Sequence, residues 1–366
     1  MPESIIIDGN YLEGGGQIVR TSLGLSALLK KGFKITDIRK NRPELGLKNQ
    51  HLHCIKALEE LCATTAIGAE LGSTNLEFES KKILPRNLNI AIGTAGSATL
   101  VLQSLILPSL FSEKKMHIKI HGGTDTAWSI PYNYFSEIIL PQLRRYCTKI
   151  EAKLIRRGYY PKGNGYIEII ITPKFSVEKY PNIEEFITAV KKEIPKINLA
   201  EQGHLLHIKG ISHASTDLQN SQVAERQAGS AKSFLARLGY PVSIRTEYSE
   251  SDSTGSGIIL WAVFSKNTDD INYLNPIILG SDALGEKRKR SEEVGKDAAE
   301  KLENEIKSGA AVDTHLADNL IPFIGLFGGE IKISEISAHT LTNIYTTEKF
   351  LGKVFNIDKE KKKIWL

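Results

Sequence analysis

The segment Glu13–Arg20 combines residue types that suit the binding of a phosphate and a metal ion. Three consecutive glycines precede an apolar helical pattern, so their backbone N–H groups can bind an anion. Arg20 lies about one turn into this helix and can donate two hydrogen bonds to the same anion. Glu13 supplies a carboxylate, a ligand that Mg²⁺ or Mn²⁺ prefers. The alternative is a glycine-rich turn whose carboxylate caps the helix.

A second glycine-rich segment, residues 93–97, also precedes an apolar helical pattern. Gln103 lies within that pattern, between Leu102 and Ser104. Because a buried amide needs hydrogen-bond partners, Gln103 either belongs to a polar network in the core or contacts a ligand.

Hydrogen-bond donors are concentrated between residues 39 and 51, around Pro43. They are Arg39, Arg42, Lys48, Gln50 and His51. Such a density of donors suits a phosphate-rich ligand. A solvated basic loop explains the same pattern equally well.

Three polar residues share one face of a predicted helix that begins near residue 314. His315, Asp318 and Asn319 are spaced i, i+3 and i+4, so they lie side by side. Such a face can bind ribose hydroxyls or the edge of an adenine. The alternative is a helix N-terminus with Asp313 or Thr314 as its capping residue.

His339 follows a predicted strand and begins the segment His339–Asn343. A lone histidine is most often a surface residue or a core residue with satisfied hydrogen bonds. The sequence holds nine histidines, so other histidines are alternative candidates for a functional residue. They are His51, His53, His121 and His315.

The segment Arg157–Gly165 predicts a tight turn before the apolar strand 166–171. Pro161 fixes one backbone angle, and Gly163 and Gly165 allow positive φ or the close approach of another backbone. A hairpin turn accounts for these features by itself.

One structural pattern occurs three times along the chain, which indicates an internal repeat. Each copy has an apolar helix, a short break and a strand: helix to about Leu29 and strand Phe33–Arg39; helix to about Leu107 and strand Met116–His121; helix to about Leu326 and strand Glu330–Ile336. A second helix is expected near each copy, at about Gln50–Cys62, Tyr132–Tyr146 and Ser291–Ile306. Helices interleaved with strands predict an α/β (α+β) fold of sheets covered by helices.

The repeat predicts a pseudo-threefold arrangement in which equivalent loops meet. These loops are residues 39–42, 122–125 and 338–343. Between residues 176 and 276 the pattern changes to a helix, a strand, a longer helix and two further strands. We therefore expect a large domain of residues 1–175 and 277–366, interrupted by a small α/β domain of residues 176–276.

Composition fits a water-soluble globular protein. Apolar residues make up 41% of the 366 residues and charged residues 24%, and no apolar run reaches membrane-spanning length. We expect no membrane partner, no signal peptide and a cytoplasmic location. The three cysteines form no C-x-x-C pair. Residues 280–287 superficially resemble a P-loop but fail it, because Glu286 precedes the lysine and no Ser or Thr follows.

Six segments, taken together, resemble the RNA 3′-terminal phosphate cyclase family over essentially the whole chain. They are Glu13–Arg20, Arg39–His51, Gly93–Gln103, Arg157–Gly165, His315–Asn319 and His339–Asn343. The fourth segment resembles the family signature R-G-x-x-P-x-G-G-G, with Asn164 at the middle glycine. Asparagine tolerates the left-handed backbone region better than other non-glycine residues, so the turn is expected to survive.

The resemblance implies ATP-dependent conversion of an RNA 3′-terminal phosphate to a 2′,3′-cyclic phosphate, with release of AMP and diphosphate. It makes His339 the nucleophile that accepts AMP and Glu13 the ligand of Mg²⁺ or Mn²⁺. It implies nucleotide contacts from Gln103, Pro131, His315, Asp318 and Asn319, and phosphate contacts from Arg20, Arg39 and Arg42. The implied fold has three repeated units of two helices on a four-stranded sheet, plus a small inserted α/β domain.

Two other functions remain open at this point. Some cyclase-like proteins act in ribosomal RNA processing and characteristically lack the nucleophilic histidine, whereas His339 is present here in an H-x-L-T-N context. The second alternative is a non-catalytic module that binds RNA ends without consuming ATP.

Overall fold

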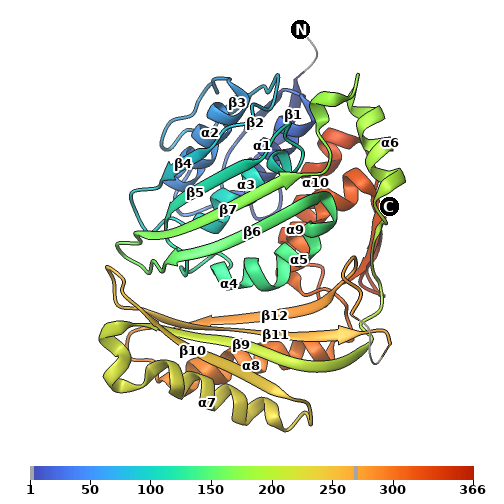
Figure 1. Ribbon diagram of the computed structural model, residues 1–366. Helices are drawn as coiled ribbons and strands as arrows, with labels where there is room; N and C mark the ends of the chain where they lie inside the picture. Colours follow the sequence, from blue (N-terminus) through green and yellow to red (C-terminus); the bar gives the residue numbers. More distant parts are fainter. Residues whose placement is uncertain (1–3, 268–270) are drawn as a thin grey trace.

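The computed structural model describes residues 4–267 and 271–366. Four small mixed sheets and their helices form a large domain and a smaller α/β layer beneath it (Figure 1). The predicted α+β class is confirmed. Within the described residues, no helix has both the length and the apolar character needed to cross a bilayer.

The second repeated unit has the order β-α-β-α-β-β. Its elements are β4 (Leu88–Ala91), α3 (Ala98–Leu110), β5 (Met116–Gly122), a helical stretch over residues 132–146, β6 (Cys147–Arg156) and β7 (Gly165–Pro173). Strand β4 pairs in parallel with β5, β5 is antiparallel to β7, and β7 is antiparallel to β6. Side chains of β5 alternate between buried and half-buried, which is the pattern of a strand with one face on the core.

The third unit repeats this pairing. It contains β8 (Ile197–Leu199), α9 (Thr314–Phe327), β13 (Gly329–Lys332), α10 (Ala338–Leu351), β14 (Asn356–Asp358) and β15 (Lys363–Trp365), with α6 (Ile183–Glu193) before β8. Its sheet order, β14-β15-β13-β8, matches β6-β7-β5-β4 strand for strand. The second helix of this unit is therefore α10, not the predicted helix 291–306.

The first unit has the same order but a narrower sheet. It contains β1 (Ile5–Asp8), α1 (Gln17–Leu29), β2 (Phe33–Thr36), α2 (Asn49–Cys62) and β3 (Leu76–Phe78). These strands form a three-stranded sheet, whereas four strands were expected. A single antiparallel bridge, Ile67 to Glu77, lies where the fourth strand would pair. The threefold repeat is thus confirmed, with one strand reduced to a bridge.

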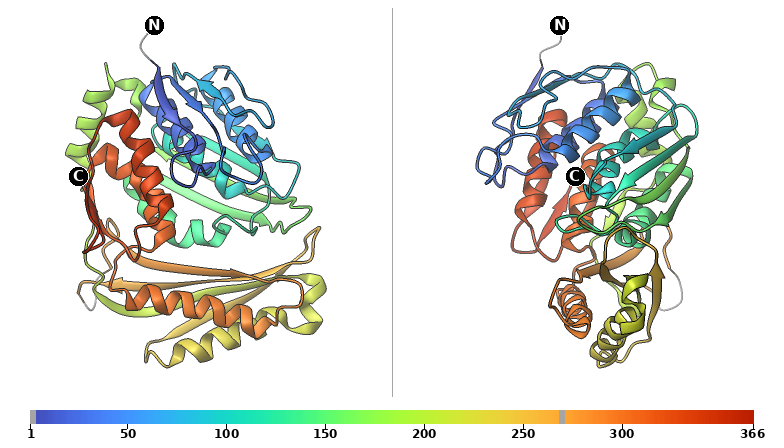
Figure 2. Two further views of the ribbon diagram at one scale, coloured as in Figure 1. Left: turned by 180° about the vertical axis from the view of Figure 1, so that it is seen from behind. Right: turned by 90° about the vertical axis from the view of Figure 1, so that its left-hand side faces the viewer.

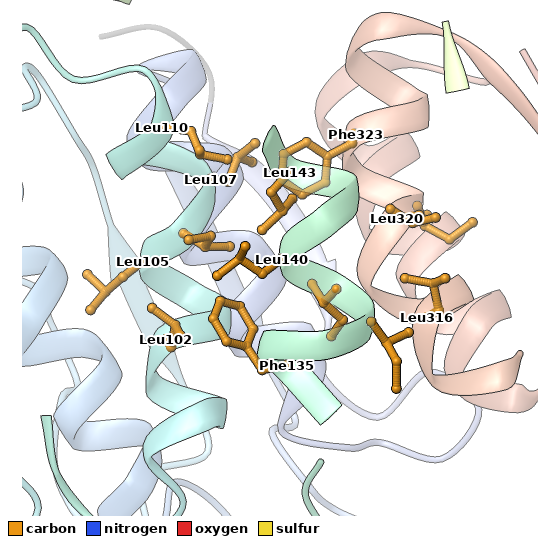
Figure 3. Packing of buried hydrophobic residues seen from close by; sticks show 14 of the residues in the cluster. Leu102, Leu105, Leu107, Leu110, Phe135, Leu140, Leu143, Leu316, Leu320 and Phe323 are labelled. Carbon is orange, nitrogen blue, oxygen red and sulfur yellow. The ribbon is translucent and has the colours of Figure 1, made fainter. Parts of the chain in front are cut away.

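Apolar side chains of the three units meet in one core. Figure 3 shows leucines of α3, the helical stretch 132–146 and α9 packed together, among them Leu105, Leu140 and Leu320. Leu105 is fully buried, so its replacement by alanine would cost about 2–5 kcal/mol of folding free energy.

The helical stretch 132–146 is irregular. It consists of α4 (Tyr132–Tyr134), a π-helical turn (Phe135–Ile139), α5 (Leu140–Leu143) and a 3₁₀ turn (Arg144–Tyr146). Pro141 lies in the first turn of α5 and has no N–H to donate. The break from regular α-helix therefore coincides with this proline.

The inserted layer contains β9 (His204–Ser215), α7 (Val223–Ala236), β10 (Val242–Ser249), β11 (Ser256–Ser265), β12 (Ile277–Leu284) and α8 (Ser291–Lys307). The sheet order is β10-β9-β11-β12. Both helices cover the face of this sheet that points away from the large domain (Figure 2). The predicted helix 291–306 therefore packs in this layer, where the Ser281 hydroxyl donates to the Ala298 backbone oxygen (2.7 Å).

The strand pairings disagree with both expected boundaries of the inserted domain, residues 176 and 276. Strand β8 belongs to the sheet of the third unit, and β12 to the inserted sheet. We propose that the domain boundaries lie between β8 and β9 and between α8 and α9.

Candidate active site

A cavity of about 690 Å³ opens where the first and third units meet, which is a typical size for a small-molecule site. Residues of the second unit and of the inserted domain complete its wall. Its lining residues are Gly15, Gly16, Gln17, Arg20, Arg39, Arg42, Lys48, Gln50, Thr99, Leu100, Gln103, Trp128, Ser129, Ile130, Asp282, Lys301, His315, Asp318, Asn319, His339 and Asn343. Eight of the ten predicted site residues are among them, the exceptions being Glu13 and Pro131.

His339 is the second residue of α10, whose N-cap is Ser337; the predicted loop 338–343 is in fact the start of this helix. The imidazole side chain is 47% exposed and borders the cavity. Burial lowers the pKa of His339 below its usual value, and the opposing effect of Glu13 is smaller. The ring is therefore accessible and favours its neutral form near pH 7.

Gln17 determines which nitrogen of this ring carries the proton. The Gln17 Nε2 atom donates to the backbone oxygen of His339 (2.8 Å), so the amide oxygen is the atom that contacts Nδ1. An amide oxygen can only accept, so Nδ1 must donate. In the neutral ring the lone pair then lies on Nε2. The sequence prediction missed Gln17, although it lies inside the segment Glu13–Arg20.

Glu13 lies beside both His339 and Arg42. Its Oε2 atom is 3.0 Å from His339 Nε2 and 3.2 Å from Arg42 Nη2. The Arg42 Nε atom also donates to the Glu13 backbone oxygen (2.8 Å). The contact with Nε2 is favourable only when this nitrogen carries a proton, so Glu13 in this position favours the imidazolium form of His339.

Arg20 is a buried cation without an anionic partner among the described residues. Its Nε atom donates to Gln103 Oε1 (2.9 Å), and Gln103 Nε2 donates to Asn319 Oδ1 (3.2 Å). This chain joins α1, α3 and α9, one helix from each unit. Burial lowers the pKa of Arg20. Because an unpaired buried charge is costly, the site favours an incoming anion.

Helix α9 presents its three predicted residues to the cavity, and Asp313 caps it by accepting from the Leu316 N–H (2.9 Å). The segment therefore contains both a capping residue and a polar helix face that lines the cavity. The Asp318 carboxylate accepts from the Thr340 hydroxyl (2.8 Å), beside His339. Burial raises the pKa of Asp318 to about 7.

The competing histidines have other surroundings. His51 is fully buried, its Nδ1 accepts from the Lys48 N–H (2.9 Å), and burial lowers its pKa to about 3. A Cβ atom at Gly16 would come within 2.0 Å of the His51 ring, so this position requires glycine. His121 stacks on Tyr166 outside the cavity, with 4.3 Å between ring centroids. Of the competitors named from the sequence, His315 alone shares the cavity with His339.

The structure departs from the predicted site at two places. Pro131 is buried at the N-cap of α4, and the cavity is lined by its neighbours Trp128, Ser129 and Ile130 instead. Residues 122–125 do not line the cavity, and Asp125 is buried against Arg157 (3.1 Å). The second unit reaches the cavity with the residues that follow in the same connection, 128–130.

Asp282 and Lys301 also line the cavity, although they come from the inserted domain. Neither residue is predicted from the sequence: Asp282 lies in residues 280–287, which fail the P-loop pattern, and Lys301 belongs to none of the motifs. Their place in the wall follows from how β12 packs on the large domain, which no local pattern reveals.

A sequence profile of the RNA 3′-terminal phosphate cyclase family matches residues 11–357 of the chain. The chain belongs to this family. It is 43% identical to the RNA 3′-terminal phosphate cyclase of Pyrococcus abyssi, over 97% of this chain and 96% of that protein. It is 41% identical to the Methanosarcina barkeri cyclase (97% and 96% covered) and 38% identical to that of Archaeoglobus fulgidus (98% of each). The cyclase resemblance and the assignment to a ligase-type enzyme family are confirmed.

No group of three or more His, Cys, Asp or Glu side chains able to hold a metal ion occurs in the described part of this cyclase-family chain. Mg²⁺ usually keeps several waters and binds through one or two carboxylates together with substrate phosphates. A single carboxylate at Glu13, beside Arg42 of the cavity wall, is compatible with that mode. The metal assignment remains a prediction.

Proposed function

We propose that this protein converts an RNA 3′-terminal phosphate to a 2′,3′-cyclic phosphodiester in an ATP-dependent reaction, through a covalent histidine–AMP intermediate. The observation that carries the proposal is the pairing of His339 with Gln17, which directs the lone pair of the neutral ring to Nε2 in a half-exposed imidazole that borders the arginine-lined cavity. The proposed partners are ATP and an RNA that ends in a 3′-phosphate. A cytoplasmic location remains a prediction from the sequence.

In the first step, His339 Nε2 attacks the α-phosphorus of ATP. The new N–P bond replaces the bond to the bridging oxygen, and diphosphate leaves. Arg20, Arg39 and Arg42 stabilise the negative charge on the phosphates, and the N–H groups that precede α1 can donate to them as well. Gln17 keeps the proton on Nδ1, so in the neutral ring Nε2 is the nitrogen with the lone pair.

Glu13 regulates the availability of that nitrogen. While its carboxylate lies 3.0 Å from Nε2, it competes for the ring by favouring the protonated imidazolium. Glu13 with nucleotide phosphate oxygens would hold Mg²⁺ or Mn²⁺, which supplies charge neutralisation at the phosphates when bound. Drawing the Glu13 charge away from the ring favours neutral Nε2.

In the second step, an oxygen of the RNA 3′-phosphate attacks the phosphorus held by His339. The N–P bond breaks, and the product is an RNA capped with AMP through a phosphoanhydride. The adjacent 2′-hydroxyl then attacks the RNA phosphorus, loses its proton, and AMP leaves. The hydroxyl and the phosphorus belong to the same ribose, so proximity assists this closure.

The test is an RNA oligonucleotide with a 3′-phosphate incubated with the protein, ATP and Mg²⁺. We expect a 3′ end that becomes resistant to phosphatase, with one AMP and one diphosphate released per cyclised end. His339→Ala should reduce this conversion to background, whereas His121→Ala, outside the cavity, should retain it. RNA binding without ATP consumption by the native protein would contradict the proposal and favour an RNA-end-binding module.

A further inference from the structure

The inserted domain is held against the large domain by a buried polar cluster at the turn Arg157–Gly165. Arg157 contacts Asp125 (3.1 Å) within the large domain and Glu247 (2.9 Å) on β10. The Tyr159 hydroxyl forms a 2.8 Å hydrogen bond with the Nδ1 atom of His213 on β9. The turn therefore acts as a docking element between the two domains and lies outside the cavity.

A second contact places β12 against the helix that carries the polar face. The Gly280 N–H donates to Asp313 Oδ2 (2.9 Å), and Asp313 is the N-cap of α9. A Cβ atom at Gly280 would come within 2.6 Å of the Tyr134 ring, so the strand backbone lies directly on the large domain. The position of β12 is thus tied to the first turn of α9.

Strand geometry then determines where Asp282 points. Side chains two residues apart lie on the same face of a strand. Ser281 faces α8, since its hydroxyl donates to Ala298, so Gly280 and Asp282 share the opposite face, toward the large domain. The Lys301 Nζ atom donates to the backbone oxygen of Asp282 (2.9 Å) and holds this part of the strand in place.

The Asp282 carboxylate oxygens can accept further hydrogen bonds. Among the described residues it accepts no hydrogen bond and forms no ion pair, although the side chain is only partly exposed. It lines the cavity together with His315. A half-buried carboxylate on a cavity wall, without donors of its own, is suited to accept from a bound ligand.

The order of contacts along α9 indicates which part of a nucleotide would lie there. His315 lies in the first turn of α9, next to the N-cap Asp313 that contacts β12, and Asp318 and Asn319 follow one turn later, about 5.4 Å along the axis. That second turn contacts Thr340, next to His339, and the Gln103–Arg20 chain. The phosphates therefore belong at the second turn, and Asp282 lies at the end of the cavity where the nucleoside would extend.

We propose that the inserted domain completes the ATP pocket, with Asp282 accepting a hydrogen bond from the nucleoside of ATP and thereby serving as a specificity residue. This inference rests on the proposed function. It gives the inserted domain a direct part in nucleotide selection, and it gives the Arg157–Gly165 turn the part of keeping Asp282 in the cavity wall.

The test measures the dissociation constant of α,β-methylene-ATP, which cannot transfer AMP, for the native protein and for Asp282→Asn. We expect Asp282→Asn to weaken binding about tenfold. The matched control is Asp297→Asn, which removes the same charge from α8 at an ion pair with Lys289, outside the cavity, and should leave binding unchanged. Asp282→Ala serves as a second variant if the first fails to fold.

Nucleoside analogues identify the contact. The native protein should discriminate against one of the 2′-deoxy, 3′-deoxy or inosine forms of this ligand, and Asp282→Asn should lose that discrimination. Equal binding by native and variant proteins, or an Asp282→Asn effect confined to transfer of AMP to RNA, would overturn the inference. The proposed function would survive that result; it would fail instead if the native protein bound the analogue but formed no adduct with ATP.

Discussion

Two polar regions of this molecule use the same kinds of side chain in opposite ways. At the junction of the second unit with the inserted domain, Arg157, Asp125 and His213 are buried and surrounded by partners. At the cavity, Arg20 is also buried, but among the described residues its side chain donates to the amide oxygen of Gln103 and to no carboxylate, and His339 is half exposed. A cluster in which the buried charges are paired with one another stabilises the fold. A buried cation without a paired anion can instead bind an anionic ligand.

The largest contrast is expected when each buried arginine is replaced by methionine. Arg157→Met should lower the free energy of unfolding by about 3–5 kcal/mol, because it removes the guanidinium that pairs with the buried Asp125 carboxylate. Arg20→Met should change stability by no more than about 1 kcal/mol, yet weaken ATP binding roughly 100-fold. Urea denaturation and nucleotide titration of both variants measure the two effects. Similar losses of stability in the two variants would contradict the distinction.

Gln17→Leu tests whether the proton on Nδ1 matters. Without the amide oxygen, the ring can place its proton on Nε2, which removes the nucleophilic lone pair. We expect adduct formation with ATP to slow about 100-fold or more, with ATP affinity changed much less. Single-turnover rates at saturating ATP separate the two quantities. An unchanged rate would show that Gln17 only supports the backbone of α10.

The two regions should also differ in how the free energy of unfolding depends on pH, although this effect is smaller. Burial raises the pKa of Asp318 to about 7 in the folded protein, against about 3.9 in an unfolded chain. The folded state therefore holds the extra proton between these values, and stability should fall as pH rises from about 4 to 7, by about 1–4 kcal/mol. Asp318→Asn should flatten this part of the curve, with a remaining slope from Glu305, whose pKa burial also raises to about 7.

The contribution of Asp125 to stability should change with pH in the opposite direction from that of Asp318. Burial alone would raise its pKa, but His213 and Arg157 hold the pKa of this carboxyl well below its usual range. Its contribution to stability is present above about pH 3.9 and is lost as the pH falls toward its folded-state pKa. Acid unfolding of Asp318→Asn should therefore match that of the native protein. An Asp318→Asn protein that differed from the native protein in how stability falls with acid would contradict this assignment of signs.

The sequence predicts much of this architecture because the deciding patterns are local. Glycine-rich segments before apolar helices mark α1 and α3, and the turn at Asn164 adopts the left-handed backbone that asparagine tolerates (φ 54°). The sequence also predicts helix 291–306 at the right place, but it does not predict which elements this helix packs against. Its neighbours are set by the pairing of β11 with β12, which depends on residues remote in the sequence.

The residues of the candidate site likewise fall into those with a local sequence signal and those without one. Arg20, Gln103 and His339 lie in short recognisable segments, and the structure brings all three to one cavity. Asp282 and Gln17 escaped notice because their significance depends on a neighbour from another element. Pro131 was assigned from the family resemblance, while in the structure the side chains before it reach the cavity.

The measurement that tests the central claim most directly is the intact mass of the protein after exposure to ATP and Mg²⁺, followed by fragmentation to locate any added group. We predict a single added AMP on the native protein, located at His339, and none on His339→Ala. His315→Ala, at the other histidine of the cavity, should still acquire the group at His339. An AMP retained by His339→Ala, or located on a different residue of the native protein, would contradict the account.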